Sequence, residues 1–185
     1  YAYWHGKTFT VTYSLYGGAM DSTTAEVVYG EPFKLDVPVN TDERDTRYAF
    51  AGWYTSGYGE GTRCTDEAGN GLGNWDLSGD VTLHAYWAEV LTFVPTTGQA
   101  GEPAYTVEAG PEIDQVTSVT IPATFRESPV TDILSGAFSN CDTLVEINIP
   151  NSIRTVGARS LTDSTGAFSS CDNLMDLNVY EVEGS

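Results

Sequence analysis

Two histidines and three cysteines are the residues best suited to metal binding or nucleophilic chemistry, but their spacing favours neither. His5 and His84 stand alone, without the partner four positions away that a zinc-binding helix supplies. Cys64, Cys141 and Cys171 are odd in number and form no C-x-x-C pair. We therefore expect both histidines to be exposed strand residues rather than ligands, and we expect no disulfide framework.

Cys141 and Cys171 occupy equivalent places in two similar segments, so they could form a redox-active or disulfide-bonded pair. Their apolar neighbours favour buried, unreactive thiols instead. The number of cysteines leaves the redox compartment open.

Several oxygen-bearing side chains are concentrated in one glycine-rich stretch and could bind calcium. Their spacing misses the EF-hand pattern, so solvated turn residues are the favoured interpretation and a calcium site stays an alternative. The candidates are Asp66, Glu67, Asn70, Asp76 and Asp80.

The segment 69–73, Gly-Asn-Gly-Leu-Gly, could in principle cradle a phosphate. It neither follows a predicted strand nor opens an apolar helix, so we interpret it as a flexible loop. The sequence also contains no G-x-S-x-G elbow and no P-loop. We therefore expect no enzyme, no catalytic residue, no cofactor and no resident metal, and the sequence assigns no ligand-binding residue.

The chain is strongly acidic, with 26 Asp and Glu against 8 Lys and Arg and a formal net charge of −18 over 185 residues. This charge would repel a polyanion, which argues against nucleic acid and anionic membrane surfaces as partners. No apolar stretch is long enough to span a bilayer, so we expect no membrane insertion in this chain. Tyr, Thr and Val between scattered Gly and Pro are typical of short strands joined by turns, and we predict a mainly β fold.

Four strands are predicted in the first half of the chain, at 7–15, 24–29, 48–54 and 80–87. The first alternates strictly between apolar and polar residues, as a half-buried strand does. Between the third and fourth lies the polar, glycine-rich stretch 55–79, which we expect to be an exposed loop or a small subdomain.

Five motifs occur in order in this half: Thr10-Val11-Thr12-Tyr13, Gly17-Gly18, Tyr29-Gly30-Glu31, Phe50-Ala51-Gly52-Trp53-Tyr54 and Thr82-Leu83-His84-Ala85-Tyr86-Trp87. Together they resemble the Listeria-Bacteroides repeat, also called the internalin B-type repeat. The resemblance implies a β-grasp-like domain over 7–92, of a kind found in bacterial surface proteins. Residues 1–4 also resemble 84–87, so we expect 1–6 to be the end of a preceding copy.

This copy departs from the repeat at two places. Arg47 stands where a glycine usually precedes the aromatic residue, and the stretch 55–79 is long. We expect any specialised contact of this domain to lie in 55–79. The residues that follow, 93–104, are rich in Thr, Pro and Gly and are interpreted as a linker. Within them 94–98, Val-Pro-Thr-Thr-Gly, faintly resembles a sortase signal, but no hydrophobic tail follows it.

A second internal repeat occupies the C-terminal half. The segment 137–144 recurs 30 positions later at 167–174, and 119–122 recurs 28 positions later at 147–150. The two offsets differ because the copies carry insertions at different places. When these insertions are left out, the repeat length falls in the low twenties of residues, which is typical of a leucine-rich solenoid. Such coils stack like on like. We therefore expect Leu144, Ile147 and Ile149 to point inward, Phe138 to lie against Phe168, and Cys141 near Cys171.

The second repeat is similar to the BspA-type leucine-rich repeat of bacterial surface proteins, over residues 105–185. This resemblance implies an extracellular protein, on the bacterial cell surface or secreted, that adheres to a host or matrix protein or a glycan through its repeats, with the β-repeat as spacer. The alternative is a purely structural spacer or stalk. An exposed patch of aromatic or Asp and Asn residues would favour the binding protein, and the candidates are Tyr58, Trp75, Tyr180 and the insertion 158–165. The ligand, the source organism, the parent protein's remaining domains and the oligomeric state stay open.

Overall fold

A computed structural model describes residues 6–41, 45–157 and 166–182. The chain is mainly β, as predicted, and forms two compact units. The first unit comprises Tyr1–Asp42 and Phe50–Trp87, and the second comprises Glu43–Ala49 and Ala88–Ser185. The expected end of a preceding repeat falls almost wholly on residues outside the described part.

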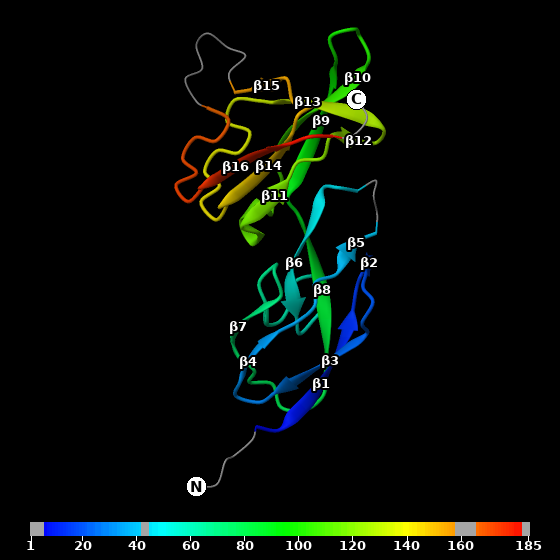
Figure 1. Ribbon diagram of the computed structural model, residues 1–185, viewed down its shortest axis with the longest axis vertical. Helices are drawn as coiled ribbons and strands as arrows, with labels where there is room; N and C mark the ends of the chain where they lie inside the picture. The colour runs from blue at the N-terminus through cyan, green and yellow to red at the C-terminus, as the bar shows by residue number, and fades with distance from the viewer. Residues whose placement is uncertain (1–5, 42–44, 158–165, 183–185) are drawn as a thin grey trace. The chain divides into compact units, whose positions relative to one another are not determined.

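The first unit is built on a four-stranded sheet in the order β3-β1-β8-β6 (Figure 1). Strand β1 runs antiparallel to β3 and parallel to β8, so strands from the two ends of the unit lie side by side at the centre of the sheet. These strands occupy the four segments that alternation and aromatic content predicted. Their bounds are β1 Thr8–Ser14, β3 Thr24–Val28, β6 Tyr48–Tyr54 and β8 Val81–Glu89.

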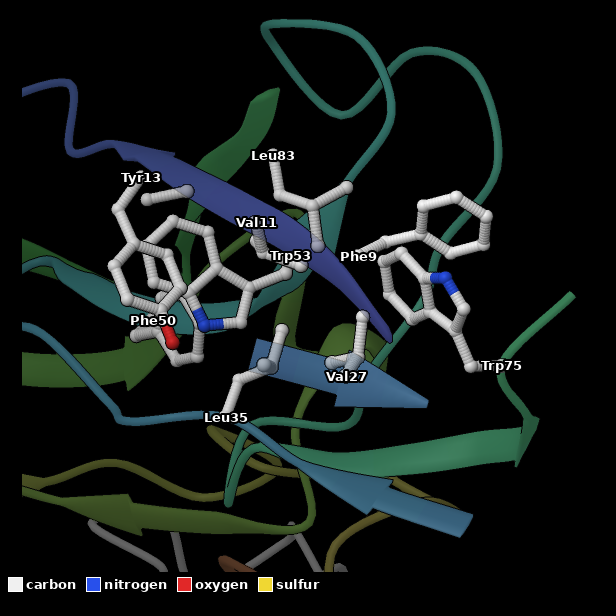
Figure 2. Close-up of a cluster of buried hydrophobic side chains, with 10 residues drawn as sticks. Phe9, Val11, Tyr13, Val27, Leu35, Phe50, Trp53, Trp75 and Leu83 are labelled. Carbon is white, nitrogen blue, oxygen red and sulfur yellow. The ribbon is translucent and has the colours of Figure 1, made fainter. Parts of the chain in front are cut away.

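One face of this sheet carries the core of the first unit, shown in Figure 2. On β1 Phe9, Val11 and Tyr13 are buried, whereas the intervening threonines point outward. Trp53 is fully buried, its ring stacks on Tyr13 at a centroid distance of 4.6 Å, and its Nε1 donates a hydrogen bond to the Asp36 carbonyl at 2.9 Å. The strict alternation of apolar and polar residues therefore predicted the buried face of β1 correctly.

Much of the stretch 55–79 is packed into the first unit, which corrects the expectation of an exposed loop. Strand β7 (Asn70–Asn74) pairs antiparallel with β4 (Pro32–Lys34). Trp75 is only 2% exposed and packs edge to face against Phe33. A further short pair joins β2 (Gly18–Ala19) to β5 (Val39–Asn40). The buried indole explains the correction, because a tryptophan in a polar segment can still anchor that segment to a core.

Residues 93–104, expected to be a linker, instead form most of a β-hairpin in the second unit. Strand β9 (Leu91–Thr97) pairs antiparallel with β10 (Pro103–Ala109) along seven residue pairs. Pro95 is tolerated because β9 is the edge strand of its sheet, where a missing backbone N–H breaks no ladder. The sheet continues through β13 (Ser128–Ile133), which pairs with β12 (Thr124–Phe125) and β15 (Thr155–Val156).

Arg47, the departure from the repeat pattern, belongs to the second unit. Its backbone carbonyl accepts hydrogen bonds from the N–H groups of Val90 and Leu91, at 2.8 and 3.2 Å. Its guanidinium is hydrogen-bonded to Asp45 at 2.7 and 2.9 Å and also contacts Glu89 at 3.3 Å. The hydrogen bond from Arg47 holds the pKa of the Asp45 carboxyl below its usual range. Arg47 thus ties the start of β9 to the segment before β6.

Three parallel strands form a second sheet in this unit, in the order β11-β14-β16 (Figure 1). They are β11 (Ser118–Thr120), β14 (Glu146–Pro150) and β16 (Asp176–Tyr180), and a short 3-10 helix, η1 (Ile113–Gln115), precedes them. Val119 is opposite Ile147, and Ile147 is opposite Leu177. These pairs are separated by the same 28 and 30 positions that separate the repeated sequence segments.

The interior of the second unit confirms the contacts expected from the repeat. Leu144 and Ile147 are fully buried and Ile149 is 4% exposed. The rings of Phe138 and Phe168 stack with a centroid distance of 5.7 Å. The Phe138 N–H donates to the Ala167 carbonyl at 2.8 Å, so the backbones of the two turns are also hydrogen-bonded.

Candidate binding surfaces

The candidate metal ligands are not gathered into one site. His5 lies outside the described residues. His84 is on β8, where its ring lies against Tyr16 at a centroid distance of 5.6 Å and its Nδ1 is buried. Within residues 6–41, 45–157 and 166–182, no three His, Cys, Asp or Glu side chains are grouped as a metal ion would require.

Three of the oxygen-bearing side chains considered for calcium, Asp66, Asn70 and Asp80, make structural hydrogen bonds in the first unit. One Asp66 oxygen accepts hydrogen bonds from the N–H groups of Ala68 and Asn70, at 3.0 and 2.8 Å, and the other accepts from the Asn70 amide at 2.9 Å. Asp80 caps the N–H of Thr10 at 2.8 Å. These groups close a turn and fix a strand, which accounts for their presence without a cation.

The glycine-rich segment 69–73 is mostly strand rather than flexible loop, because β7 begins at Asn70. A Cβ on Gly71 would lie 2.6 Å from the Phe33 ring, so the missing side chain makes room for that ring. Gly71 therefore serves packing, and the hypothesis of a phosphate cradle gains no support. The 94–98 segment likewise lies largely in β9.

All three cysteines are free thiols. Burial raises the pKa of Cys141 to about 11, with a smaller contribution from the neighbouring Cys171. Burial likewise raises the pKa of Cys64 to about 11, assisted by Asp76. The Cys171 thiol donates a hydrogen bond to the Phe138 carbonyl at 2.7 Å. These environments suit buried thiols that stack between repeats better than a reactive pair.

The candidate surface residues differ sharply in exposure. Tyr58 is 81% exposed and lies in the turn that precedes the packed part of 55–79. Trp75 is a core residue, so its place among the surface candidates was wrong. Tyr180 is partly buried, and its hydroxyl donates to the Ile121 carbonyl at 2.6 Å. The insertion 158–165 lies outside the described residues.

The outward face of β11, β14 and β16 carries a ladder of polar side chains in the second unit. Residues at equivalent positions are directly opposite one another, and hydrogen bonds link some of them. The Asn178 amide donates to Glu146 at 3.1 Å and to Asn148 at 3.2 Å, and the Asn148 amide donates to Thr120 at 3.4 Å. We call this surface the polar ladder. Its members are Ser118, Thr120, Glu146, Asn148, Asp176 and Asn178.

The described part of the chain also contains hollows away from the polar ladder. A cavity of about 180 Å³ in the first unit is lined by Phe33, Cys64 and Trp75, among others. A shallow groove of about 460 Å³ lies along 19–22 and 36–39, where Val39 is 65% exposed. In the second unit a small polar cavity of about 110 Å³ lies beside the buried Asp132.

Comparison with protein-family models and with curated proteins gives no match. Among solved structures, the leucine-rich repeat protein of T. pallidum matches with a TM-score of 0.34 at 20% sequence identity, over 46% of this chain. The match spans 36% of that protein's chain, which is little more than a third of its length. A likeness at this TM-score supports no assignment of fold or function. No helix in the described residues is both long and apolar enough to cross a membrane.

Proposed function

We propose that this chain is a non-catalytic part of a bacterial surface or secreted protein that binds a host or matrix protein, or a glycan, through its second unit. In this proposal the second unit is a short leucine-rich-repeat solenoid of the BspA type, and the first is a β-grasp-like repeat that acts as spacer. The chain takes no cofactor.

The observation that carries the proposal is the register of the three parallel strands. Residues 28 and 30 positions apart in the sequence are paired in space, and the polar members form one continuous surface. The apolar members of β11 and β14, Val119, Ile147 and Ile149, are buried, whereas Leu177 and Val179 of β16 are exposed. Stacked repeats of this kind present an extended face on which each coil contributes equivalent side chains, which suits contact with a large ligand.

The chemistry of the polar ladder limits its partner. Amide and hydroxyl groups offer both donors and acceptors, and Glu146 and Asp176 add negative charge. An acidic face in a chain of net charge −18 repels nucleic acid and sulfated glycans. A neutral glycan or a basic surface of a matrix protein fits this face better.

The direct test is binding of the 185-residue chain to an array of matrix proteins and glycans. The probe variant is Asn148→Arg, which places a bulky cation in the middle of the polar ladder, and the matched control is Gln99→Arg, which adds the same charge at the exposed β9–β10 turn. We expect binding that survives in the control and falls about tenfold or more in the probe variant.

The alternative is a spacer or stalk in which neither unit contacts a ligand. It is favoured if the wild-type chain binds nothing on the array. Binding that Asn148→Arg leaves unchanged would also count against the polar ladder as the contact surface.

A further inference from the structure

Two exposed tyrosines from distant parts of the sequence meet on the surface of the first unit. Tyr16 follows β1 and is 45% exposed, and Tyr58 lies in the turn after β6 and is 81% exposed. Their rings are in edge-to-face contact, with a centroid distance of 5.2 Å and an interplanar angle of 65°. The ring of His84 lies beside Tyr16, 5.6 Å from centroid to centroid. We call Tyr16, Tyr58 and His84 the aromatic platform.

Both tyrosines have an unusual backbone conformation. Tyr16 has a φ of 47° and Tyr58 a φ of 60°, a region that bulky residues rarely adopt. Of the non-glycine residues with a positive φ in the described part of the chain, Tyr16 and Tyr58 are the aromatic ones, and strain of this kind persists only where the surrounding structure enforces it. Glycine would occupy either position without strain, yet tyrosine occupies both.

The turn that carries Tyr58 is shaped around aromatic rings. A Cβ on Gly57 would lie 2.6 Å from the Tyr16 hydroxyl, and a Cβ on Gly59 would lie 2.8 Å from the Tyr86 ring. The glycines on either side of Tyr58 thus let the turn pack closely on Tyr16 and Tyr86. Close packing on both sides holds the Tyr58 ring at the surface instead of letting it fold into a core.

From this arrangement we propose that the aromatic platform binds the pyranose rings of a neutral glycan. Rings only 5.2 Å apart leave no space for a group between them, so a ligand must lie over an outer ring face, where the apolar C–H face of a pyranose can pack. Tyr58 is 81% exposed, so its ring offers an open face rather than the enclosed pocket that an apolar peptide side chain needs for its burial. The net charge of −18 disfavours acidic glycans.

The turn also supplies polar groups beside the platform. Thr55, Ser56 and Glu60 flank Tyr58 in the sequence, and Glu60 is exposed. Hydroxyl and carboxylate oxygens next to an aromatic face provide the hydrogen bonds that orient a sugar. This site lies in the unit that the proposed function treats as a spacer, so it is independent of the polar ladder.

The test is titration of the 185-residue chain with three neutral oligosaccharides, cellohexaose, laminarihexaose and N-acetylchitohexaose, and with choline as the cationic probe. Binding is followed by the aromatic resonances of Tyr16 and Tyr58 in NMR spectra. We expect at least one oligosaccharide to shift both sets of resonances at millimolar concentration or below. Tyr58→Ala should weaken that binding about tenfold, and Tyr58→Phe, which keeps the ring, should retain it.

The matched control is Tyr29→Ala, because Tyr29 is 47% exposed but packs on Phe9 elsewhere in the unit. It should leave the titration unchanged, as should Asn148→Arg in the polar ladder. Folding of the Tyr58 and Tyr29 variants is checked by tryptophan fluorescence, since all four tryptophans lie within 1–87, and folding of Asn148→Arg is checked by far-ultraviolet circular dichroism. The proposal is overturned if no oligosaccharide shifts the two tyrosines, if only choline does, or if a folded Tyr58→Ala variant binds as tightly as the wild type.

Discussion

Phe138 and Phe168, 30 positions apart in the sequence, stack with ring centroids 5.7 Å apart and an interplanar angle of 29°. Phe138 is fully buried, whereas Phe168 is half-buried. Phe138→Ala should therefore lower the free energy of unfolding of the second unit by about 3–5 kcal/mol, and Phe168→Ala by clearly less. Chemical denaturation followed by far-ultraviolet circular dichroism measures both. Equal losses would contradict the burial difference.

The turns that carry these phenylalanines share a left-handed residue. Asn140 has a φ of 59° and Ser170 a φ of 58°. Asparagine tolerates this conformation better than serine does. Ser170→Gly should raise the free energy of unfolding by about 0.5–1 kcal/mol, while Asn140→Gly should change it little. The denaturation midpoints of the two variants measure this difference. A larger increase in stability for Asn140→Gly than for Ser170→Gly would contradict the prediction.

The two buried tryptophans of the first unit differ in their polar atoms. Trp53 Nε1 donates to the Asp36 carbonyl, whereas Trp75 Nε1 is buried and has no acceptor in the described part of the chain. Trp53→Phe leaves the Asp36 carbonyl without its hydrogen-bond donor. Trp75→Phe removes an N–H group that has no acceptor in that part of the chain. Trp53→Phe should therefore cost at least about 1 kcal/mol more than Trp75→Phe. Urea denaturation, followed by the remaining tryptophans, tests this order.

Because burial raises the pKa of the Cys64 and Cys141 thiols, their reactivity should increase as the pH rises. The pKa of Cys64 and of Cys141 is raised to about 11, so at neutral pH both are almost wholly protonated in the folded chain. Because the thiolate is the nucleophile, native alkylation should be slow at pH 7 and should accelerate steadily as the pH approaches 11. Mass spectrometry after timed exposure to iodoacetamide measures the rate at each cysteine. Rapid modification of native Cys141 at neutral pH would contradict its burial.

The regular elements were predictable because their periodicity is local. The alternation of apolar and polar residues predicted β1 and its buried residues. The repeated segments around Phe138 and Ile147 predicted the contacts between stacked turns and the sequence separation of the paired residues. These features depend on residues next to one another or on an exact internal repeat, and both can be seen in one sequence.

The failures share a different physical origin. Trp75 and β7 were missed because their partners, Phe33 and β4, lie some 40 positions away, and pairing of this kind leaves no local pattern. The β9–β10 hairpin was hidden by Pro95, which is compatible with an edge strand alone. Tyr16 was not among the surface candidates, because a turn after a predicted strand does not by itself indicate an exposed ring. Its exposure is set by the turn around Tyr58, which no sequence period marks.

The parallel pairing of β1 with β8 has a mechanical consequence. The register from Val11↔Val81 to Ser14↔His84 joins the first strand of the unit directly to its last. A pulling force applied at the two ends of the unit would act along these strands in opposite directions, so their hydrogen bonds would be loaded together rather than opened one after another. We therefore expect the first unit to resist stretching along this axis.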